Sequence, residues 1–141
     1  MKEPKIMVVD DEAGLRDTLS ETLSGKGFDV TSAKDGMESL RYMRTTKYDL
    51  IVTDINMPHL NGIELLKKMK KAGRKEKVVV MTGSAVELSD FNEMPLVYFQ
   101  LQKPFKMDDF LHVVSSVLKS KRRSAGLKRG KRQTGRMRNA V

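Results

Sequence analysis

Charged and polar residues follow the apolar runs of this sequence, and their types suit metal and phosphoryl chemistry. Asp10 ends the run KIMVVD and Asp11 follows it, Asp54 ends YDLIVTD, Thr82 lies near the end of KVVVMTG, and Lys103 follows LVYFQLQ. A carboxylate beside a buried apolar run is costly unless it has a partner. Carboxylates within ~4 Å of one another repel by roughly 4 kcal/mol per pair at the effective dielectric constant of a protein surface. A hard divalent cation relieves that repulsion, and oxygen-only ligands favour Mg²⁺ over Zn²⁺.

Such a site would make Asp54 a nucleophile. With a cation neutralising its charge, a phosphoryl group could be transferred to Asp54, giving an aspartyl-phosphate. The ammonium of Lys103, the hydroxyl of Thr82 and the backbone N–H groups after Asp54 and Thr82 would bind phosphoryl oxygens. Phosphoryl transfer depends mainly on this kind of positioning and charge stabilisation.

These residues can meet only if the apolar runs are strands of one sheet. Apolar and β-branched residues predict strands over 5–10, 28–33, 48–54, 77–83 and 96–102. Helical patterns lie between and after them: Leu15, Leu19 and Leu23 before Gly25 and Gly27; Leu40 and Met43 after Asp35-Gly36; Ile63, Leu66 and Met69 after Gly62; a weak pattern from Val86 to Phe91; and Phe110, Val114, Val117 and Leu118.

This alternation predicts an α/β fold with a doubly wound, five-stranded parallel sheet and helices on both faces. The runs at 5–10, 48–54 and 77–83 are apolar on both faces, as covered parallel strands must be. Ligands of such sheets bind beyond the carboxyl ends of the strands. We therefore expect the polar groups at those ends to converge on one rim.

Four motifs at these strand ends resemble those of the receiver domains of bacterial two-component response regulators. They are VVDDE (8–12), VTDINMPHLNG (52–62), VVVMTGSA (78–85) and QKPF (102–105). The similarity covers about residues 4–120 and is greatest to the single-domain, chemotaxis-protein-like members. It implies a flavodoxin-like sheet of order 2-1-3-4-5, a histidine kinase or phosphotransfer protein as phosphoryl donor, and a downstream target protein whose binding phosphorylation switches.

The resemblance also implies roles for residues that match its motifs. Asp54 corresponds to the phosphoacceptor. Asp10, Asp11 and Asp54 would bind Mg²⁺, with the backbone carbonyl of Asn56 as a further ligand. Thr82 corresponds to the hydroxyl residue that moves toward the phosphoryl group.

Lys103 corresponds to the lysine of the family, whose bond to the following proline, here Pro104, is usually cis. One position departs from the pattern, because Gln100 stands where receivers usually carry Tyr or Phe, three residues before the lysine. Since side chains alternate along a strand, Tyr98 is expected to share the face of Gln100. The aromatic part of the output switch is therefore expected to be weakened or relocated to Tyr98.

Each residue also has an ordinary structural interpretation. Asp10 and Asp11 suit a helix N-cap, Thr82 a strand-end hydroxyl, and Lys103 a solvated lysine. Their common placement at strand ends favours the functional interpretation. His59 and His112 are expected to be neither metal ligands nor phosphohistidines.

Charge is distributed unevenly along the 141 residues. Ten of the 27 Lys and Arg residues lie from Lys119 onward without an acidic residue, which leaves 17 basic and 18 acidic residues in the rest. We expect a receiver domain over 1–120 and a basic, disordered tail over 121–141. The tail could bind nucleic acid or another anionic surface or partner, or only aid solubility. It lacks the interleaved aromatic residues that would stack on bases.

Composition narrows the function classes further. With no cysteine, the chain can form neither disulfides nor thiolate metal sites. No signal peptide or membrane span is evident, so a cytoplasmic protein is expected.

Two alternative functions are set beside the receiver. A phosphatase or phosphotransferase could also use an aspartyl-phosphate, as dehalogenase-like enzymes do, but those enzymes need a second aspartate where this chain has Asn56. A nucleic-acid-binding adaptor could act through the tail. The expectation is a receiver that assists its own phosphotransfer and dephosphorylation and is not a conventional enzyme.

Overall fold

The computed structural model of the chain describes residues 2–83 and 94–121. Five parallel strands form one sheet in the order β2-β1-β3-β4-β5, which confirms the predicted fold class and strand order. The strands are β1 (Lys5–Val9), β2 (Asp29–Ala33), β3 (Leu50–Asp54), β4 (Lys77–Thr82) and β5 (Val97–Gln102).

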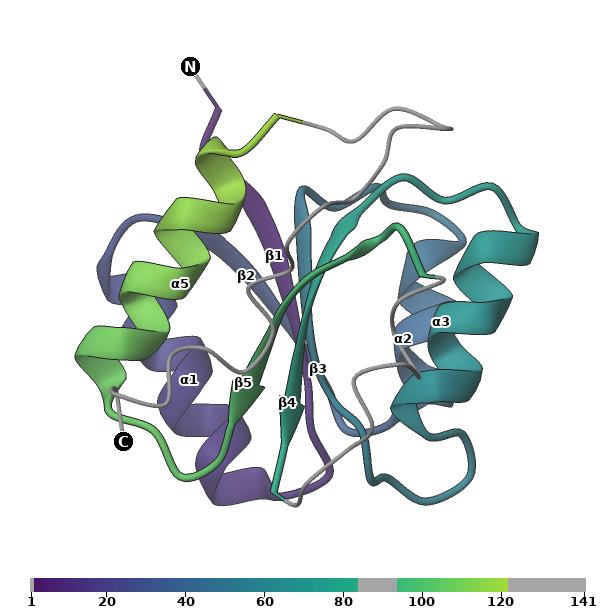
Figure 1. Ribbon diagram of the computed structural model, residues 1–141, viewed down its shortest axis with the longest axis horizontal. Helices are drawn as coiled ribbons and strands as arrows, with labels where there is room; N and C mark the ends of the chain where they lie inside the picture. The colour runs from purple at the N-terminus through teal and green to yellow at the C-terminus, as the bar shows by residue number, and fades with distance from the viewer. Residues whose placement is uncertain (1, 84–93, 122–141) are drawn as a thin grey trace.

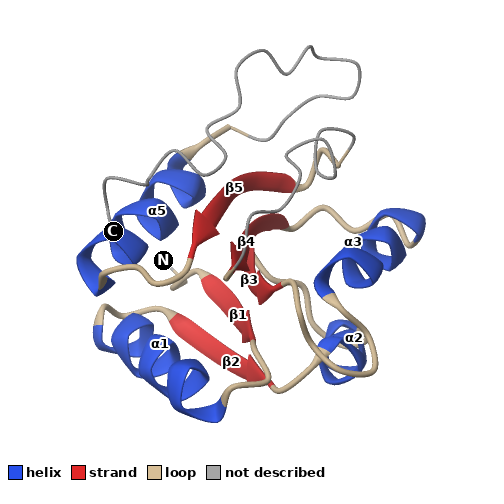
Figure 2. Cartoon of the chain, turned by 60° about the horizontal axis from the view of Figure 1, so that its bottom comes forward, coloured by secondary structure: helices blue, strands red, loops and turns tan. Residues whose placement is uncertain are grey.

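The helices are α1 (Ala13–Gly25), α2 (Gly36–Met43), α3 (Gly62–Lys71) and α5 (Met107–Lys119). Figures 1 and 2 show α1 and α5 on one face of the sheet and α2 and α3 on the other. The helix predicted from Val86 to Phe91 lies outside the described residues, as does the predicted tail from residue 122 onward.

Each face of the sheet has its own apolar core. Residues of β1, β3 and β4 contribute to both cores, since their side chains alternate between the faces. The α1/α5 core includes Ile6, Leu19, Leu23, Val52 and Phe110, whereas the α2/α3 core includes Met7, Met43, Ile51, Leu65 and Met69. Because helices cover both faces, polar groups of the sheet are left with the two ends of the strands. We call these the amino edge, where the strands begin, and the carboxyl edge, where they end.

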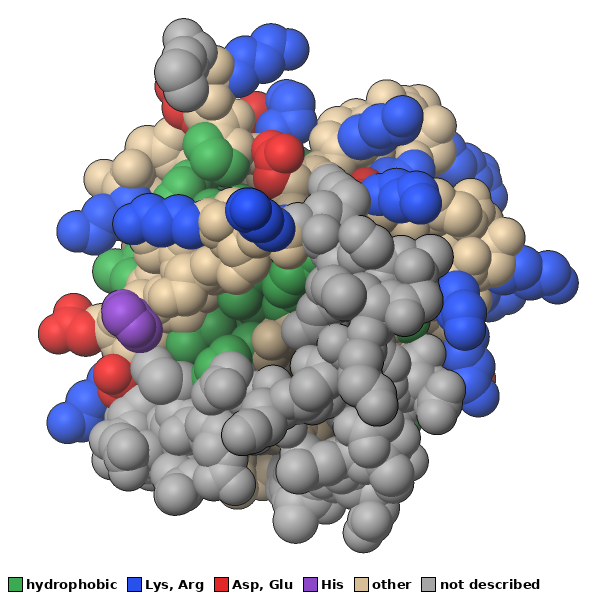
Figure 3. Space-filling model, turned by 45° about the horizontal axis from the view of Figure 1, so that its top comes forward, with side chains coloured by type: hydrophobic (Ala, Val, Ile, Leu, Met, Phe, Trp, Pro, Cys, Tyr) green, Lys and Arg blue, Asp and Glu red, His purple; other side chains and the backbone are tan. Residues whose placement is uncertain are grey.

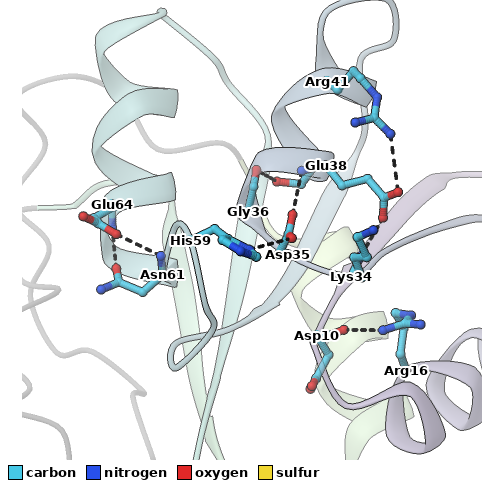
Figure 4. A network of polar contacts seen from close by, with 11 residues as sticks. Asp10, Arg16, Lys34, Asp35, Gly36, Glu38, Arg41, His59, Asn61 and Glu64 are labelled. Atoms are coloured by element: carbon cyan, nitrogen blue, oxygen red, sulfur yellow. Dashed lines mark hydrogen bonds and ion pairs between the residues drawn. The ribbon is translucent and has the colours of Figure 1, made fainter.

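Both helices of the α2/α3 layer begin with a side-chain cap. Asp35 accepts a hydrogen bond from the Glu38 backbone N–H at 2.8 Å, and Asn61 forms a reciprocal capping box with Glu64 (Figure 4). His59 Nδ1 lies 3.3 Å from Asp35 Oδ2, so the loop after β3 contacts the start of α2. The Glu38 N–H and the neighbouring His59 together hold the pKa of Asp35 below its usual value, against the opposing effect of burial.

The amino-terminal edge of the sheet contains a buried ion pair. Arg74 binds the Glu76 carboxylate and donates to the carbonyls of Met43 and Thr46 at 2.8 and 3.0 Å. Glu76, only 3% exposed, also accepts the Tyr48 backbone N–H at 3.0 Å. The strand predicted from residue 48 begins at Leu50.

A second buried charge lies beside this pair. Lys77, at the start of β4, donates to the carbonyls of Val117 and Leu118 at 3.0 and 3.4 Å and to that of Ser120. Its ammonium also lies 5.4 Å from the centre of the Tyr98 ring. Lys77 therefore caps the carboxyl end of α5, where the helix dipole favours a cation.

Candidate functional site

Charged side chains from three strand ends meet at the carboxyl edge of the sheet. Lys103 Nζ lies 3.1 Å from Asp10 Oδ2 and 3.4 Å from Asp54 Oδ2. Carboxylate oxygens of Asp10, Asp11 and Asp54 all lie within 4.8 Å of one another. The expected convergence is thus present, although Asp10 and Lys103 are 93 residues apart in sequence.

Backbone groups fix the two buried carboxylates. Asp10, fully buried, accepts the Glu12 N–H on Oδ1 at 2.9 Å, which leaves Oδ2 for Lys103. Asp54 is 6% exposed and accepts the Ile55 N–H on Oδ1 at 2.8 Å. The N-cap of α1 is Glu12, without a side-chain capping bond, so the N-cap interpretation of Asp10 and Asp11 does not hold.

Arg16 is a site residue that the sequence patterns do not reveal. Its Nη1 donates to the Asp10 carbonyl at 2.8 Å, one turn into α1 (Figure 4). Nothing in the spacing of the motifs marks this residue, because an arginine in the first turn of an amphipathic helix is usually a solvated side chain. The contact ties α1 to the loop that carries the acidic pair.

Burial and mutual repulsion set the charge state of the cluster. Burial, followed by the nearby Asp10 carboxylate, raises the pKa of Asp54 above its usual value, although Lys103 and the Ile55 N–H act in the opposite direction. Burial alone would lower the pKa of Lys103, but its contacts with Asp10 and then Asp54 raise it on balance. One ammonium therefore serves two buried carboxylates, and the cluster holds more negative than positive charge.

The remaining predicted residues surround this cluster. Thr82 is the last residue of β4 and is buried, and its carbonyl accepts the Lys103 N–H at 2.7 Å. The Lys103–Pro104 bond is cis, as the resemblance implies. Asn56 is exposed in the loop after Asp54, and His112 is exposed on α5.

Gly62 is packed directly against the backbone of the acceptor. A Cβ at this position would lie 2.5 Å from the Asp54 carbonyl oxygen and 2.9 Å from the Ile55 Cα. Both atoms belong to the backbone, so they cannot move aside as a flexible side chain would. The Gly62 N–H also donates to the Ile55 carbonyl at 2.8 Å. Glycine is therefore required by this close approach, more than by any unusual dihedral angle.

The expected placement of Tyr98 is wrong, because β5 contains a bulge. Val78 pairs with Val97 but Val79 pairs with Phe99, which leaves Tyr98 as the extra residue. Tyr98 consequently packs against the α1/α5 core, and its hydroxyl lies 3.4 Å from the Lys121 carbonyl.

Gln100 points the other way. It pairs with Val80, which belongs to the α2/α3 core, and neighbours in register share a face. Gln100 is 4% exposed, and its amide Nε2 has no hydrogen-bond partner in the described part of the chain. Relocation of the switch to Tyr98 thus loses its geometric basis.

No helix among residues 2–83 and 94–121 is long and apolar enough to cross a membrane.

Known proteins share both the sequence pattern and the fold. The chain is 32% identical over 121 residues to sporulation initiation phosphotransferase F of Bacillus subtilis, covering 84% of this chain and 96% of that protein. It is 34% identical to transcriptional regulatory protein FixJ of Bradyrhizobium diazoefficiens over 81% of this chain and 56% of the relative. The chain thus spans about half the length of such transcriptional regulators, including DltR of Streptococcus agalactiae, of which it covers 48%.

Solved structures agree with this assignment. Chemotaxis response regulator CheY4 of Vibrio cholerae matches 82% of this chain and 99% of its own with a TM-score of 0.77 and 26% identity. Response regulator TrrA of Thermotoga maritima, solved in complex with Mg²⁺–BeF, matches 83% of this chain and 99% of its own with a TM-score of 0.71 and 29% identity. The family model of the response regulator receiver domain matches residues 6–115. With that match and the strand-end cluster at the expected positions, the chain belongs to the response regulator receiver domain family.

Proposed function

We propose that this chain is a phosphorylatable signalling receiver whose acceptor is Asp54. The observation that carries the proposal is the position of Lys103, within 3.1 Å of Asp10 and 3.4 Å of Asp54. A phosphoryl group on Asp54 would lie beside the Lys103 ammonium and the carboxylates of Asp10 and Asp11. A histidine kinase or phosphotransfer protein is the proposed donor, consistent with the phosphotransferase and regulator relatives.

The proposed transfer is from a donor histidine on another protein to Asp54. A carboxylate oxygen of Asp54 bonds to phosphorus, the phosphorus–nitrogen bond of the donor phosphohistidine breaks, and the released imidazole takes up a proton. The Lys103 ammonium neutralises charge on a phosphoryl oxygen, and the Thr82 hydroxyl is proposed to bind another. Because the transfer is to the protein itself, we propose that the chain is no conventional enzyme, although it assists formation and hydrolysis of its own phosphoryl bond.

The donor set fits Mg²⁺. Ligand atoms on opposite sides of an octahedral Mg²⁺ lie about 4 Å apart. One oxygen from each of the three carboxylates lies within 4.8 Å of the others, so the carboxylates would need to move together only slightly to bind the ion. Asp10, Asp11 and Asp54, with the Asn56 carbonyl, are the proposed ligands. The ion would offset the repulsion from Asp10, which adds to burial in raising the pKa of Asp54. The Mg²⁺–BeF complex of the related TrrA supports this choice of metal.

Output is proposed to be protein binding controlled by Thr82, without an aromatic partner on β5. Gln100 occupies the aromatic position and Tyr98 faces α5, so the weakened form of the aromatic switch is the one we propose. The downstream target is proposed to be a protein. A cytoplasmic location is proposed with it.

The acceptor can be tested by mass. Purified protein is incubated with Mg²⁺ and a small phosphodonor such as acetyl phosphate, and its intact mass is measured. We expect one added phosphoryl group on the wild type and on Asp17→Ala, an exposed carboxylate on α1, and none on Asp54→Ala. Asp11→Ala should lose most of the Mg²⁺ dependence. Phosphorylation of Asp54→Ala equal to that of the wild type would contradict the proposal.

A further inference from the structure

An open groove with a cavity volume of about 440 Å³ lies between the carboxyl-terminal halves of α2 and α3. It is at the opposite edge of the sheet from the carboxylate cluster, because α2 and α3 begin near that cluster and end at Met43 and Lys71. Its floor is apolar, with Leu40, Met43 and Met69, and its rim is basic, with the exposed side chains of Arg44, Lys68 and Lys71. A fourth cation, Arg74, also lines the groove and is paired with Glu76. Figure 3 shows Lys and Arg side chains gathered on this side of the molecule, where Figure 1 places α2 and α3.

The basic rim has no internal counter-charge. Lys5, Arg41 and Arg74 each form an ion pair with a carboxylate. By contrast, none of the rim cations has a carboxylate within 4.0 Å among residues 2–83 and 94–121, and no acidic residue lines the groove there. The three rim cations thus place positive charge without a carboxylate partner beside an apolar surface.

The helix dipole explains only part of this charge. Cations in the last turn of a helix are favourable, and Lys68, Lys70 and Lys71 occupy that turn of α3. However, Lys68 and Lys71 both line the groove three residues apart on α3, and like charges at such spacing repel. Arg44 adds a further cation from α2, across the groove. An acidic ligand would turn this repulsion into attraction.

We propose that this groove binds an acidic amphipathic helix of a partner protein. Apolar side chains of such a helix, spaced i, i+3/i+4 and i+7, would occupy the floor, and its flanking carboxylates would pair with the rim. A volume of about 440 Å³ lies in the range of ligand-binding clefts. Nucleic acid would use the cations but leave the apolar floor unused, and among the described residues no aromatic side chain lines the groove to stack on a base. A bilayer surface cannot follow a recessed floor, so a helix suits the site better than a membrane.

The test uses the full chain and a designed probe. The probe is a fluorescein-labelled helical peptide with leucines on one face and glutamates on the other, and binding is followed by fluorescence anisotropy at low and high salt. Lys68→Glu/Lys71→Glu should weaken binding about ten-fold at low salt, and the loss should shrink as salt is added. The matched control is Lys26→Glu/Lys119→Glu, which reverses two exposed lysines at the ends of α1 and α5 and should leave binding unchanged.

A floor variant and two other ligands, duplex DNA and lipid vesicles, distinguish a helical peptide from the alternative occupants of the groove. Leu40→Gln should weaken peptide binding several-fold, because it changes the floor without changing the charge. Circular dichroism establishes that each variant is folded. The proposal is overturned if both charge-reversal pairs lose binding equally, or if Leu40→Gln binds as well as the wild type. It is also overturned if duplex DNA or phosphatidylserine vesicles bind through Lys68 and Lys71 while the peptide does not. Phosphorylation of Asp54 is measured separately, so failure here leaves the proposed function untouched.

Discussion

Charged side chains are buried at both edges of the sheet, but the two edges differ in how well these charges are paired. At the amino edge, Glu76 has Arg74 and a backbone N–H as partners, and Lys77 has three backbone carbonyls. At the carboxyl edge, Asp10 and Asp54 also each accept a backbone N–H, but the two carboxylates share the ammonium of Lys103.

This difference separates structural charges from functional ones. A buried charge whose hydrogen bonds are all made inside the protein needs no ligand to explain it. A cluster with excess charge of one sign destabilises the fold and is a candidate binding site. The comparison predicts that substitutions at the amino edge lower stability, whereas neutralising the acceptor at the carboxyl edge raises it.

The largest effect is expected for Glu76→Gln. This change leaves the Arg74 guanidinium, whose side chain is 19% exposed, without its carboxylate. Breaking a buried pair in this way typically costs about 3–5 kcal/mol. Urea unfolding should show that loss, while Glu21→Gln, on the exposed surface of α1, should stay within about 0.5 kcal/mol of the wild type. Equal stability of the two variants would mean that the amino-edge pair contributes nothing.

Lys77→Met should have a smaller effect of the same sign. The substitution preserves the length of the side chain but removes the donor to the Val117, Leu118 and Ser120 carbonyls. Leaving such acceptors unpaired costs about 1–3 kcal/mol. Hydrogen exchange should localise the loss to the last turn of α5, and Lys26→Met is the exposed control. Uniform exchange along α5 would contradict the capping role.

The smallest effect, and the only one of opposite sign, is expected for Asp54→Asn. In buffer with EDTA, removing the repulsion with Asp10 should raise the free energy of unfolding by about 0.5–2 kcal/mol. Because folding raises the pKa of Asp54, the folded state retains its proton to higher pH than the unfolded state does. Wild-type stability should therefore fall as pH rises from the usual carboxyl range through the raised pKa, and the variant should lack this decline.

Repeating the stability comparison of wild type and Asp54→Asn with added Mg²⁺ tests the same idea more directly. The ion should stabilise the wild type and thereby reduce or reverse the advantage of Asp54→Asn, as chemical denaturation can measure. An Asp54→Asn protein less stable than the wild type in EDTA would remove the contrast between the two edges.

Much of the carboxyl edge was predictable from sequence. Apolar runs mark β1, β3 and β4, and parallel strands must end at a common edge, so Asp10, Asp54 and Lys103 could be placed together before any coordinates were considered. Asp35 and Gly36 likewise marked the start of α2. These inferences depend on local patterns and on one rule of topology.

The amino edge was not predictable in this way. The segment KAGRKEK, residues 71–77, reads as a solvated loop, and nothing in it marks Glu76 and Lys77 as buried. Apart from Arg74, the groups that they bind through hydrogen bonds are backbone atoms 28 to 43 residues away, which carry no sequence signal. The bulge at Tyr98 could not be predicted from sequence either, because it depends on how β5 pairs with β4 and not on the residues of β5 alone.

Gly62 leaves so little space between the first turn of α3 and the Asp54 carbonyl that helix and acceptor peptide have to shift together. An environment-sensitive fluorophore on α3, for example at the exposed Lys67, would therefore register displacement of that peptide from outside the pocket. The close approach of one glycine thus makes α3 a natural place to build an optical sensor of pocket occupancy.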